Sequence, residues 1–305
     1  MKTTFLKSLL TIVCLLCSVG VYAHDFKADG IYYNITDTIN KTVEVTFGGF
    51  YEYTGSIVIP ATVACFGKTY NVTSIGDEAF RFCTELTSVT IPNSVTLIDY
   101  SAFERCMELT SVTIPNSVTE IRHSAFDGCT KLTEITIPNS VTFMGGAFKG
   151  CQSLTSITIP NGVTFIGVTA FSGCTRLTSV TIPNTVTKIE MRAFEKCRRL
   201  TEITISNSVS EIEYRAFYKC TALTSITLPN SVTEIGEEAF AYCESLKEIR
   251  VEATTTPAIQ SSTFDNIEKS TPVYVPAGCG ESYRSADDWS EFTNIIEFVP
   301  EVTAP

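Results

Sequence analysis

Cysteine is the residue whose type and spacing most directly suggest chemistry in this 305-residue chain. Eight of the 12 cysteines form one series, with steps of 23 residues and a single step of 22: Cys83, Cys106, Cys129, Cys151, Cys174, Cys197, Cys220 and Cys243. Zinc needs four ligands that converge on one point, often from a Cys-x-x-Cys pair, and a regular ladder does not supply them. Thiols at equivalent positions of stacked units point the same way and rarely reach disulfide geometry. The series therefore predicts buried thiols that pack as small apolar side chains, with no metal site and no cofactor.

Two further cysteines, Cys65 and Cys279, lie outside this series and near its two ends. If units of about 4.8 Å stack between them, they are roughly 40 Å apart and cannot form a bridge within one chain. Cys279 could instead link two molecules, which would give a dimer.

Catalytic side chains are scarce. The chain has only two histidines, His24 and His123. A catalytic triad needs a histidine held between a nucleophile and an acid, whereas His123 falls in a variable turn. The Glu237-Glu238 pair is more typical of solvated carboxylates than of an acid–base pair. We therefore expect no catalytic residues and no enzymatic activity.

The elements that position these residues are copies of one unit. Apolar side chains recur at fixed offsets, as in the unit Cys106, Leu109, Val112, Ile114, Pro115, Val118, Ile121, Ala125, Phe126 and Cys129. A period of about 23 residues is typical of a solenoid. One such coil is too small to fold alone, so neighbouring coils must cover its open faces and caps must cover the two ends.

Within a coil, the sequence predicts three sides. Residues 109–114 alternate between apolar and polar, as a strand with one buried face does. Pro115 ends that strand because it lacks an amide hydrogen, and Val118-x-x-Ile121 returns along a second side. Residues 125–129 fit a short helical or 3₁₀ turn that closes the coil. The fold class is thus a mainly β repeat solenoid with coils of about 23 residues.

The two ends of the chain differ from the repeat. We expect a signal peptide over residues 1–23, a β cap with a first, inserted coil over 24–70, the solenoid over 71–250, a cap over 251–298 and a tail over 299–305. The first cap should contain strands at residues 31–35 and 42–50. The second should contain a last strand at residues 272–276 and then a helix that carries Tyr283, Trp289 and Phe292.

The start of the chain has the pattern of a secretory signal. Lys2 and Lys7 precede an apolar run that is too short to cross a bilayer, and Ala23 offers a small residue at the cleavage site. Attachment as a lipoprotein through Cys14 or Cys17 is the alternative. Cleavage would change the formal charge from −11 to −13. This balance argues against nucleic acid or an anionic membrane surface as a partner. The pattern predicts a secreted protein, or one on the outer face of the bacterial envelope.

Polar side chains that alternate with the buried ones should form rows on the first side of the stack. One row is Thr90, Thr113, Thr136, Thr158, Thr181, Thr204 and Thr227. A parallel row is Ser88, Ser111, Glu134, Ser156, Ser179, Glu202 and Ser225. The rows could be only a β-compatible face copied by duplication. They could also bind a protein or a glycan, or even ice, although the two glutamates interrupt the hydroxyl lattice.

Departures from the repeat are the sharper candidates for binding. Phe143 and Phe165 occupy an outward slot in adjacent coils, next to the coil that is shortened around Gly145-Gly146 and should bend the stack there. They predict either an exposed aromatic patch or repacking at the defect. Further on, Arg192, Lys196, Arg215 and Lys219, with Arg198 and Arg199, form a basic stripe, which Glu190 and Glu213 would partly neutralise.

The units Cys-x-x-Leu-Thr-x-Ile-x-Ile-Pro-Asn-x-Val-Thr-x-Ile-x-x-x-Ala-Phe-x-x-Cys resemble the BspA-type leucine-rich repeat of bacterial surface and secreted proteins, from about Asp29 to Phe298. The resemblance implies adhesion to extracellular proteins or to other bacteria and carries no catalytic or ligand-binding motif. We therefore expect a binding or adhesion protein with a macromolecular partner. A structural spacer without a specific ligand is the alternative, and ice binding is a remote one.

Overall fold

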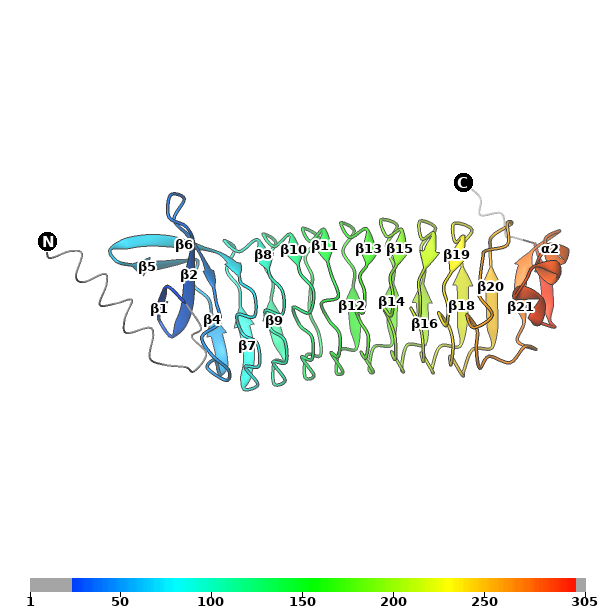
Figure 1. The fold of residues 1–305 in the computed structure, drawn as a ribbon, viewed down its shortest axis with the longest axis horizontal. Coiled ribbons are helices and arrows are strands. Elements are labelled where there is room, and N and C mark those ends of the chain that lie inside the picture. Colours follow the sequence, from blue (N-terminus) through cyan, green and yellow to red (C-terminus); the bar gives the residue numbers. More distant parts are fainter. Residues whose placement is uncertain (1–23, 300–305) are drawn as a thin grey trace, which may run out of the picture.

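A computed structural model describes residues 24–299, so the predicted signal peptide and most of the predicted tail lie outside the described residues. The described chain winds into coils that stack side by side along one axis, with the first cap at the blue end and the second at the red end (Figure 1). The coils are leucine-rich-repeat coils of about 23 residues, as the spacing predicts. No helix among residues 24–299 is long and apolar enough to cross a membrane.

The first side of the stack is built from short parallel strands. They are β4 (Gly55–Val58), β7 (Leu86–Thr90), β9 (Ser111–Thr113), β12 (Ser156–Thr158), β14 (Ser179–Thr181), β16 (Glu202–Thr204), β18 (Ser225–Leu228) and β20 (Glu248–Val251). Equivalent residues of adjacent coils pair, as Thr158 does with Thr181. Because the register repeats in this way, side chains of one repeat position form straight rows along the axis.

The second side carries a shorter set of parallel strands. They are β6 (Lys68–Ile75), β8 (Leu97–Ile98), β10 (Glu120–Ile121), β11 (Phe143–Met144), β13 (Phe165–Ile166), β15 (Lys188–Ile189), β17 (Glu211–Ile212) and β19 (Glu234–Ile235). In the seven two-residue strands, the second residue is buried and the first faces outward.

The third side closes each coil with consecutive tight turns, in agreement with the short helical or 3₁₀ turn that the sequence predicts. Backbone bonds span three residues, for example from Cys129 N–H to the Phe126 carbonyl at 3.2 Å, and others join coils, as from Phe103 N–H to the Ala125 carbonyl at 2.7 Å. Nine phenylalanines from Phe80 to Phe264 stack here, with ring centroids 5.0 to 5.9 Å apart. Residues with positive φ, such as Ser101 at +49° and Arg105 at +58°, recur within these turns, so the turns do not extend into a continuous helix.

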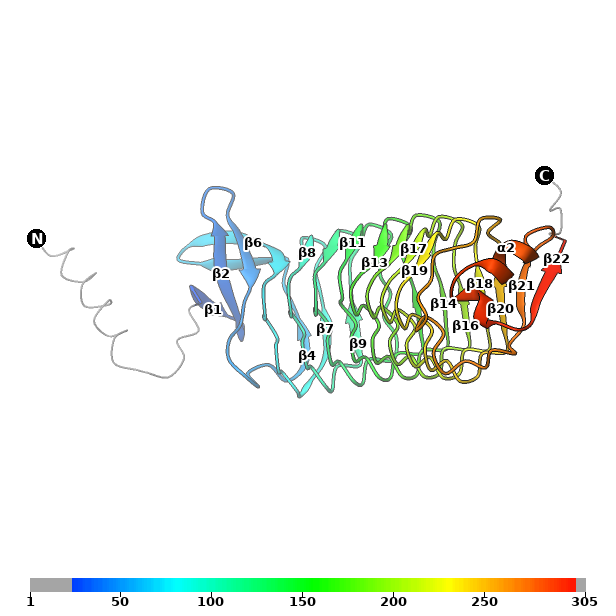
Figure 2. The same cartoon turned by 45° about the vertical axis from the view of Figure 1, so that its right-hand side comes forward.

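The first cap lies at the N-terminal end of the stack (Figure 2), and its β-sheet continues into the second side because β6 pairs with β8. Its strands are β1 (Phe26–Ala28), β2 (Ile31–Asp37), β3 (Thr42–Val45) and the hairpin of β5 (Thr62–Cys65) with β6. The strand predicted at 42–50 ends at Val45, because Gly48 lies against the Tyr32 ring and Gly49 has φ of +136°. Tyr33 and Tyr53 are buried, and the Tyr53 ring lies 4.7 Å from the ring of Phe80, the first phenylalanine of the stack.

The second cap differs from the sequence expectation in two respects. β21 (Val273–Pro276) forms where a strand was predicted, but the last strand is β22 (Ile295–Phe298), which pairs with it in parallel. The predicted single helix is broken into α2 (Gly280–Ser285) and the 3₁₀ turn η1 (Trp289–Glu291), since Asp288 between them has φ of +63°. Trp289 is buried, and its Nε1 donates to the Pro257 carbonyl at 2.9 Å.

The short coil between Cys129 and Cys151 interrupts both β sides. Residues 133–137 form no strand, and β11 pairs with β10 but, within residues 24–299, not with β13. Ala147 N–H bonds to the carbonyl of Gly145, two residues earlier, at 2.7 Å. In the preceding coil the equivalent Ala125 N–H bonds to the carbonyl of Arg122, three residues earlier. The residue that the short coil lacks is therefore the one at this corner. The widest phenylalanine spacing, 5.9 Å, lies between Phe148 and Phe171, just after this corner.

Candidate functional site

The threonine row on the first side is exposed along its whole length. Each of Thr90, Thr113, Thr136, Thr158, Thr181, Thr204 and Thr227 faces solvent. The register places consecutive members opposite one another, as in Thr90 with Thr113 and Thr181 with Thr204. We call these seven residues the hydroxyl row.

Threonines at other repeat positions serve the fold. Thr110 and Thr178 donate their hydroxyls to the backbone carbonyls of Thr87 and Thr155 in the preceding coil, at 3.1 and 3.2 Å. A second column does the same on the second side, as Thr187 does to Thr164 at 3.3 Å. Within residues 24–299, no side-chain hydrogen bond involves the hydroxyl row. Its hydroxyls are thus available to a partner.

A shallow groove of about 610 Å³ lies over part of the hydroxyl row. Its polar lining includes Thr158, Thr181 and Thr204, with the side-chain amides Asn161 and Asn184 beside them. Hydroxyls and amides both donate and accept hydrogen bonds. The groove therefore suits a partner that is rich in hydroxyl or amide groups.

Phe143 and Phe165 lie together on the second side, as the sequence suggests, but they are half-buried. Their ring centroids are 5.8 Å apart, and the strip continues through His123, 6.2 Å from Phe143, to Tyr100, 6.3 Å from His123. We call these four residues the aromatic strip. Sequence reasoning placed His123 in a variable turn, and the structure shows that this turn lies beside Phe143, with Tyr100 stacked on His123.

The predicted basic stripe divides into paired and unpaired cations. Arg192 and Lys196 lie 3.7 and 3.0 Å from the buried carboxylate of Glu195, and Arg215 pairs with Glu238 at 2.8 Å. The expected neutralising residues have other partners. Glu190 accepts the Val168 N–H, while Glu213 accepts the Met191 N–H and pairs with Lys188. Bonds to Glu213 and Glu211 raise the pKa of Lys188 above its ordinary value.

Three tyrosines interleave with this stripe, and sequence reasoning missed them. Cationic groups lie over their rings: Arg192 over Tyr214 at 5.5 Å, Arg215 over Tyr218 at 4.7 Å, and Lys219 over Tyr218 and Tyr242 at 5.1 Å each. Such contacts hold long cationic side chains in place. The signal was present, since Tyr214 and Tyr218 each directly precede a basic residue.

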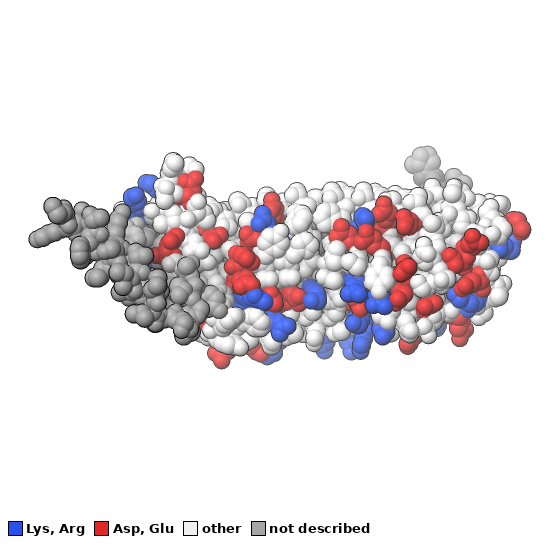
Figure 3. Space-filling view, in the orientation of Figure 1, with Lys and Arg blue, Asp and Glu red and all other residues white. Residues whose placement is uncertain are grey.

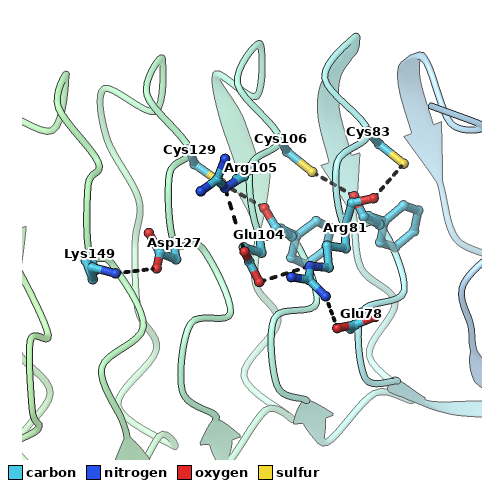
Figure 4. A network of polar contacts seen from close by, with 11 residues as sticks. Glu78, Arg81, Cys83, Glu104, Arg105, Cys106, Asp127, Cys129 and Lys149 are labelled. Atoms are coloured by element: carbon cyan, nitrogen blue, oxygen red, sulfur yellow. Dashed lines mark hydrogen bonds and ion pairs between the residues drawn. The ribbon is translucent and has the colours of Figure 1, made fainter. Parts of the chain in front are cut away.

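The cysteine series forms a buried ladder on the third side. Each thiol from Cys106 onward donates to the backbone carbonyl of a phenylalanine one coil earlier, as Cys106 does to Phe80 at 3.0 Å and Cys129 to Phe103 at 3.2 Å (Figure 4). Burial raises the pKa of Cys83 to about 11 and of Cys174 and Cys243 to about 12. Thiols with such pKa values are poor nucleophiles and poor metal ligands at neutral pH.

Ion pairs lie beside the ladder at its first coils. Arg81 pairs with Glu78 and, at 3.1 Å, with Glu104 in the next coil, while Lys149 pairs with Asp127 at 3.2 Å (Figure 4). Within residues 24–299, no three histidine, cysteine or acidic side chains gather as a metal site would require.

The stacked parallel coils, the buried leucine, phenylalanine and cysteine columns and the two caps define a leucine-rich-repeat solenoid. The profile of the BspA type leucine rich repeat region matches in six copies, over residues 62–176 and 145–271. The chain belongs to this family. Its members are protein-interaction scaffolds and are generally not enzymes.

Solved structures agree with this assignment. A leucine-rich repeat protein from Bacteroides ovatus is 30% identical, with a TM-score of 0.66 over 90% of this chain and 77% of that one. A leucine rich cell surface protein from Faecalibacterium prausnitzii is 28% identical, with a TM-score of 0.54 over 90% of this chain and 95% of that one. The leucine rich repeat protein of T. pallidum is 26% identical, with a TM-score of 0.53 over 72% and 90%. No curated protein matches the sequence.

Proposed function

We propose that this protein is a secreted or surface-associated binding protein that uses its first side to hold a macromolecular partner, and that its role is adhesion and not catalysis. The observation that carries the proposal is the hydroxyl row. Its threonines are exposed and unbonded, while threonines at other repeat positions bond to the preceding coil. Extended solenoid faces suit large partners.

Two features support the proposed location. The first 23 residues have the pattern of a secretory signal, and a similar structure is that of a cell surface protein from Faecalibacterium prausnitzii. A host matrix protein, a bacterial surface or a glycan would be accessible there. N-terminal sequencing of protein from the culture medium should begin at His24 if the leader is cleaved after Ala23.

A binding screen against matrix proteins, whole bacteria and glycan arrays tests the proposal. For each partner found, the triple variant Thr158→Val, Thr181→Val and Thr204→Val should reduce binding at least about tenfold, because it removes hydroxyls and keeps β-branched shape. The matched control replaces Thr62 and Thr69 with valine; both are exposed on the hairpin of the first cap and make no side-chain hydrogen bond within residues 24–299. A screen with no partner, or equal losses in both variants, would refute the proposal.

The aromatic strip is a second part of the proposed surface. Phe143→Ser with Phe165→Ser should weaken binding of a partner that spans both sides. If the protein is only a spacer between other envelope components, neither this variant nor the threonine variant changes any interaction. Ice binding through the hydroxyl row would instead produce thermal hysteresis, which the threonine variant would abolish.

A further inference from the structure

Four cations at one corner of the solenoid have no carboxylate partner. They are Arg176, Arg198, Arg199 and Lys219, and within residues 24–299 none of them takes part in an ion pair, whereas Lys131, Lys149 and Lys188 each do. The three arginines are exposed and Lys219 is half-buried. We call these four residues the basic corner. Figure 3 shows basic side chains gathered at the lower edge in the C-terminal half of the stack.

The register of the coils brings these cations together. Arg176 and Arg199 occupy the same repeat position one coil apart, since Thr201 N–H bonds to the Thr178 carbonyl at 3.0 Å just beyond them. The hydroxyl of Thr221, two residues after Lys219, donates to the Arg198 carbonyl at 3.4 Å. Adjacent parallel coils are about 4.8 Å apart, so the corner presents positive charge at regular short intervals along the axis.

The basic corner adjoins the hydroxyl row in the same coils. Arg176 and Arg199 each lie five residues before a threonine of the groove, Thr181 and Thr204 respectively. On the other flank, Lys219 lies 5.1 Å from the ring centroids of Tyr218 and Tyr242. Cations, hydroxyls, amides and aromatic rings therefore line neighbouring coils of the same stretch of the stack.

We infer that this surface binds an anionic polysaccharide, which lies along the axis with its sulfate or carboxylate groups on the basic corner and its hydroxyls on the hydroxyl row. This inference rests on the proposed function and names the chemical class of the partner. A linear polysaccharide repeats its charges and hydroxyls at regular intervals, as the coils do. An acidic peptide could neutralise the cations but offers fewer hydroxyls to Thr158, Thr181 and Asn184.

One acidic residue opposes this binding. Glu202 replaces a serine of the repeat on the first side, is exposed and forms no ion pair with any residue between 24 and 299. It lies three residues after Arg199 on the same coil. Removing its charge should strengthen attraction to a polyanion, because like charges at an interface repel.

Immobilised heparin is a suitable probe for the purified full chain, with dextran as the neutral and poly-glutamate as the polypeptide comparison. We expect heparin binding that weakens as salt rises. Replacing Arg176, Arg198 and Arg199 with alanine should weaken it roughly tenfold, since exposed ion pairs each contribute modestly. Glu202→Gln should strengthen it. The matched control replaces Lys131, Lys149 and Lys188 with alanine and should leave binding within about twofold.

Lys219→Gly separates binding from folding. Lys219 has φ of +59°, which glycine adopts without strain, and Gly128, Gly150 and Gly173 hold the same repeat position in other coils. The variant should keep or raise the unfolding midpoint while it weakens heparin binding.

Three results would overturn the inference: no heparin binding at low salt, equal losses in the control variant, or equal affinity for poly-glutamate. If heparin does not bind but the threonine variant still binds a partner from the screen more weakly than the unaltered protein, the inference is wrong and the proposed function is still supported. If the screen also finds no partner, both fall.

Discussion

The Nδ1 atom of His123 accepts a hydrogen bond from the backbone N–H of Gly146 at 3.0 Å. In the coils that follow, glutamates serve the equivalent amides, since Glu190 accepts the Val168 N–H and Glu213 the Met191 N–H. One imidazole thus replaces a carboxylate where the short coil lacks its corner residue. The histidine that the sequence places in a variable turn thus has a structural partner in the next coil.

Replacing His123 with alanine should lower the free energy of unfolding by about 1–3 kcal/mol, because the Gly146 amide would lose its acceptor. Urea denaturation followed by circular dichroism measures this loss. Met191→Ala is the matched control, since Met191 occupies the same repeat position and is exposed. Equal midpoints for the two variants would show that the His123 bond contributes nothing.

Gly146→Ala should be more damaging than Gly173→Ala. A Cβ at residue 146 would lie 2.2 Å from the Val168 carbonyl oxygen, a backbone atom that cannot move aside, whereas at Gly173 the nearest atom is 3.7 Å away. We expect a loss of about 3 kcal/mol or more at Gly146. At Gly173 the alanine side chain has room, and the cost of about 1–2 kcal/mol comes only from placing alanine in a left-handed backbone with φ of +75°. Paired thermal melts measure both, and the opposite ranking would contradict the geometry.

Lys196→Gly should stabilise the protein by about 0.5–1 kcal/mol, since Lys196 has φ of +60° and glycine removes that strain. The lost ion pair with Glu195 subtracts little, because the lysine side chain is half exposed. Lys149→Gly is the control. Lys149 has no positive φ, so glycine there should destabilise the fold. A lower melting temperature for Lys196→Gly would refute the strain argument.

The cysteine ladder should make the fold sensitive to alkali. Burial raises the pKa of Cys174 to about 12 from its ordinary value of 9.0, so above pH 9 the unfolded chain releases a proton that the native state keeps. Stability is therefore fully present below pH 9 and falls as pH rises toward 12, with a slope of about 1.4 kcal/mol per pH unit for this thiol. Urea midpoints at pH 7, 9 and 10 test this, and Cys174→Ala should flatten the slope.

Thiol titration distinguishes the ladder from Cys279. Cys279 is half-buried and its Sγ lies 3.6 Å from the Thr254 carbonyl, outside the phenylalanine stack. In native protein at pH 8 it should react first, and the ladder thiols only after unfolding. A dimer linked through Cys279 would appear as a doubled mass that reducing agent and Cys279→Ser both abolish. Rapid native reaction of the ladder thiols would contradict their burial.

The copied residues made the repeat predictable, because each inward side chain meets an identical neighbour one coil away and periodicity alone identifies it. Thr181 on the outside and Phe171 on the inside follow from that rule. Contacts that occur only once along the chain do not follow from the repeat. The bond from His123 to Gly146, the break of the helix at Asp288 and the pairing of Glu195 with Arg192 depend on local geometry that no second copy reveals. The tyrosines beside the basic stripe are a different case, because Tyr214 and Tyr218 each directly precede a basic residue and could have been found from the sequence.

The missing corner residue has a consequence for cooperativity. A repeat stack is stable because each coil is coupled to its neighbours, and the stack unfolds as one unit only while that coupling is uniform. At the short coil both β sides are interrupted and mainly the third side continues. The solenoid therefore has a natural boundary between two cooperative blocks, and the block that carries the basic corner could persist while the N-terminal block melts.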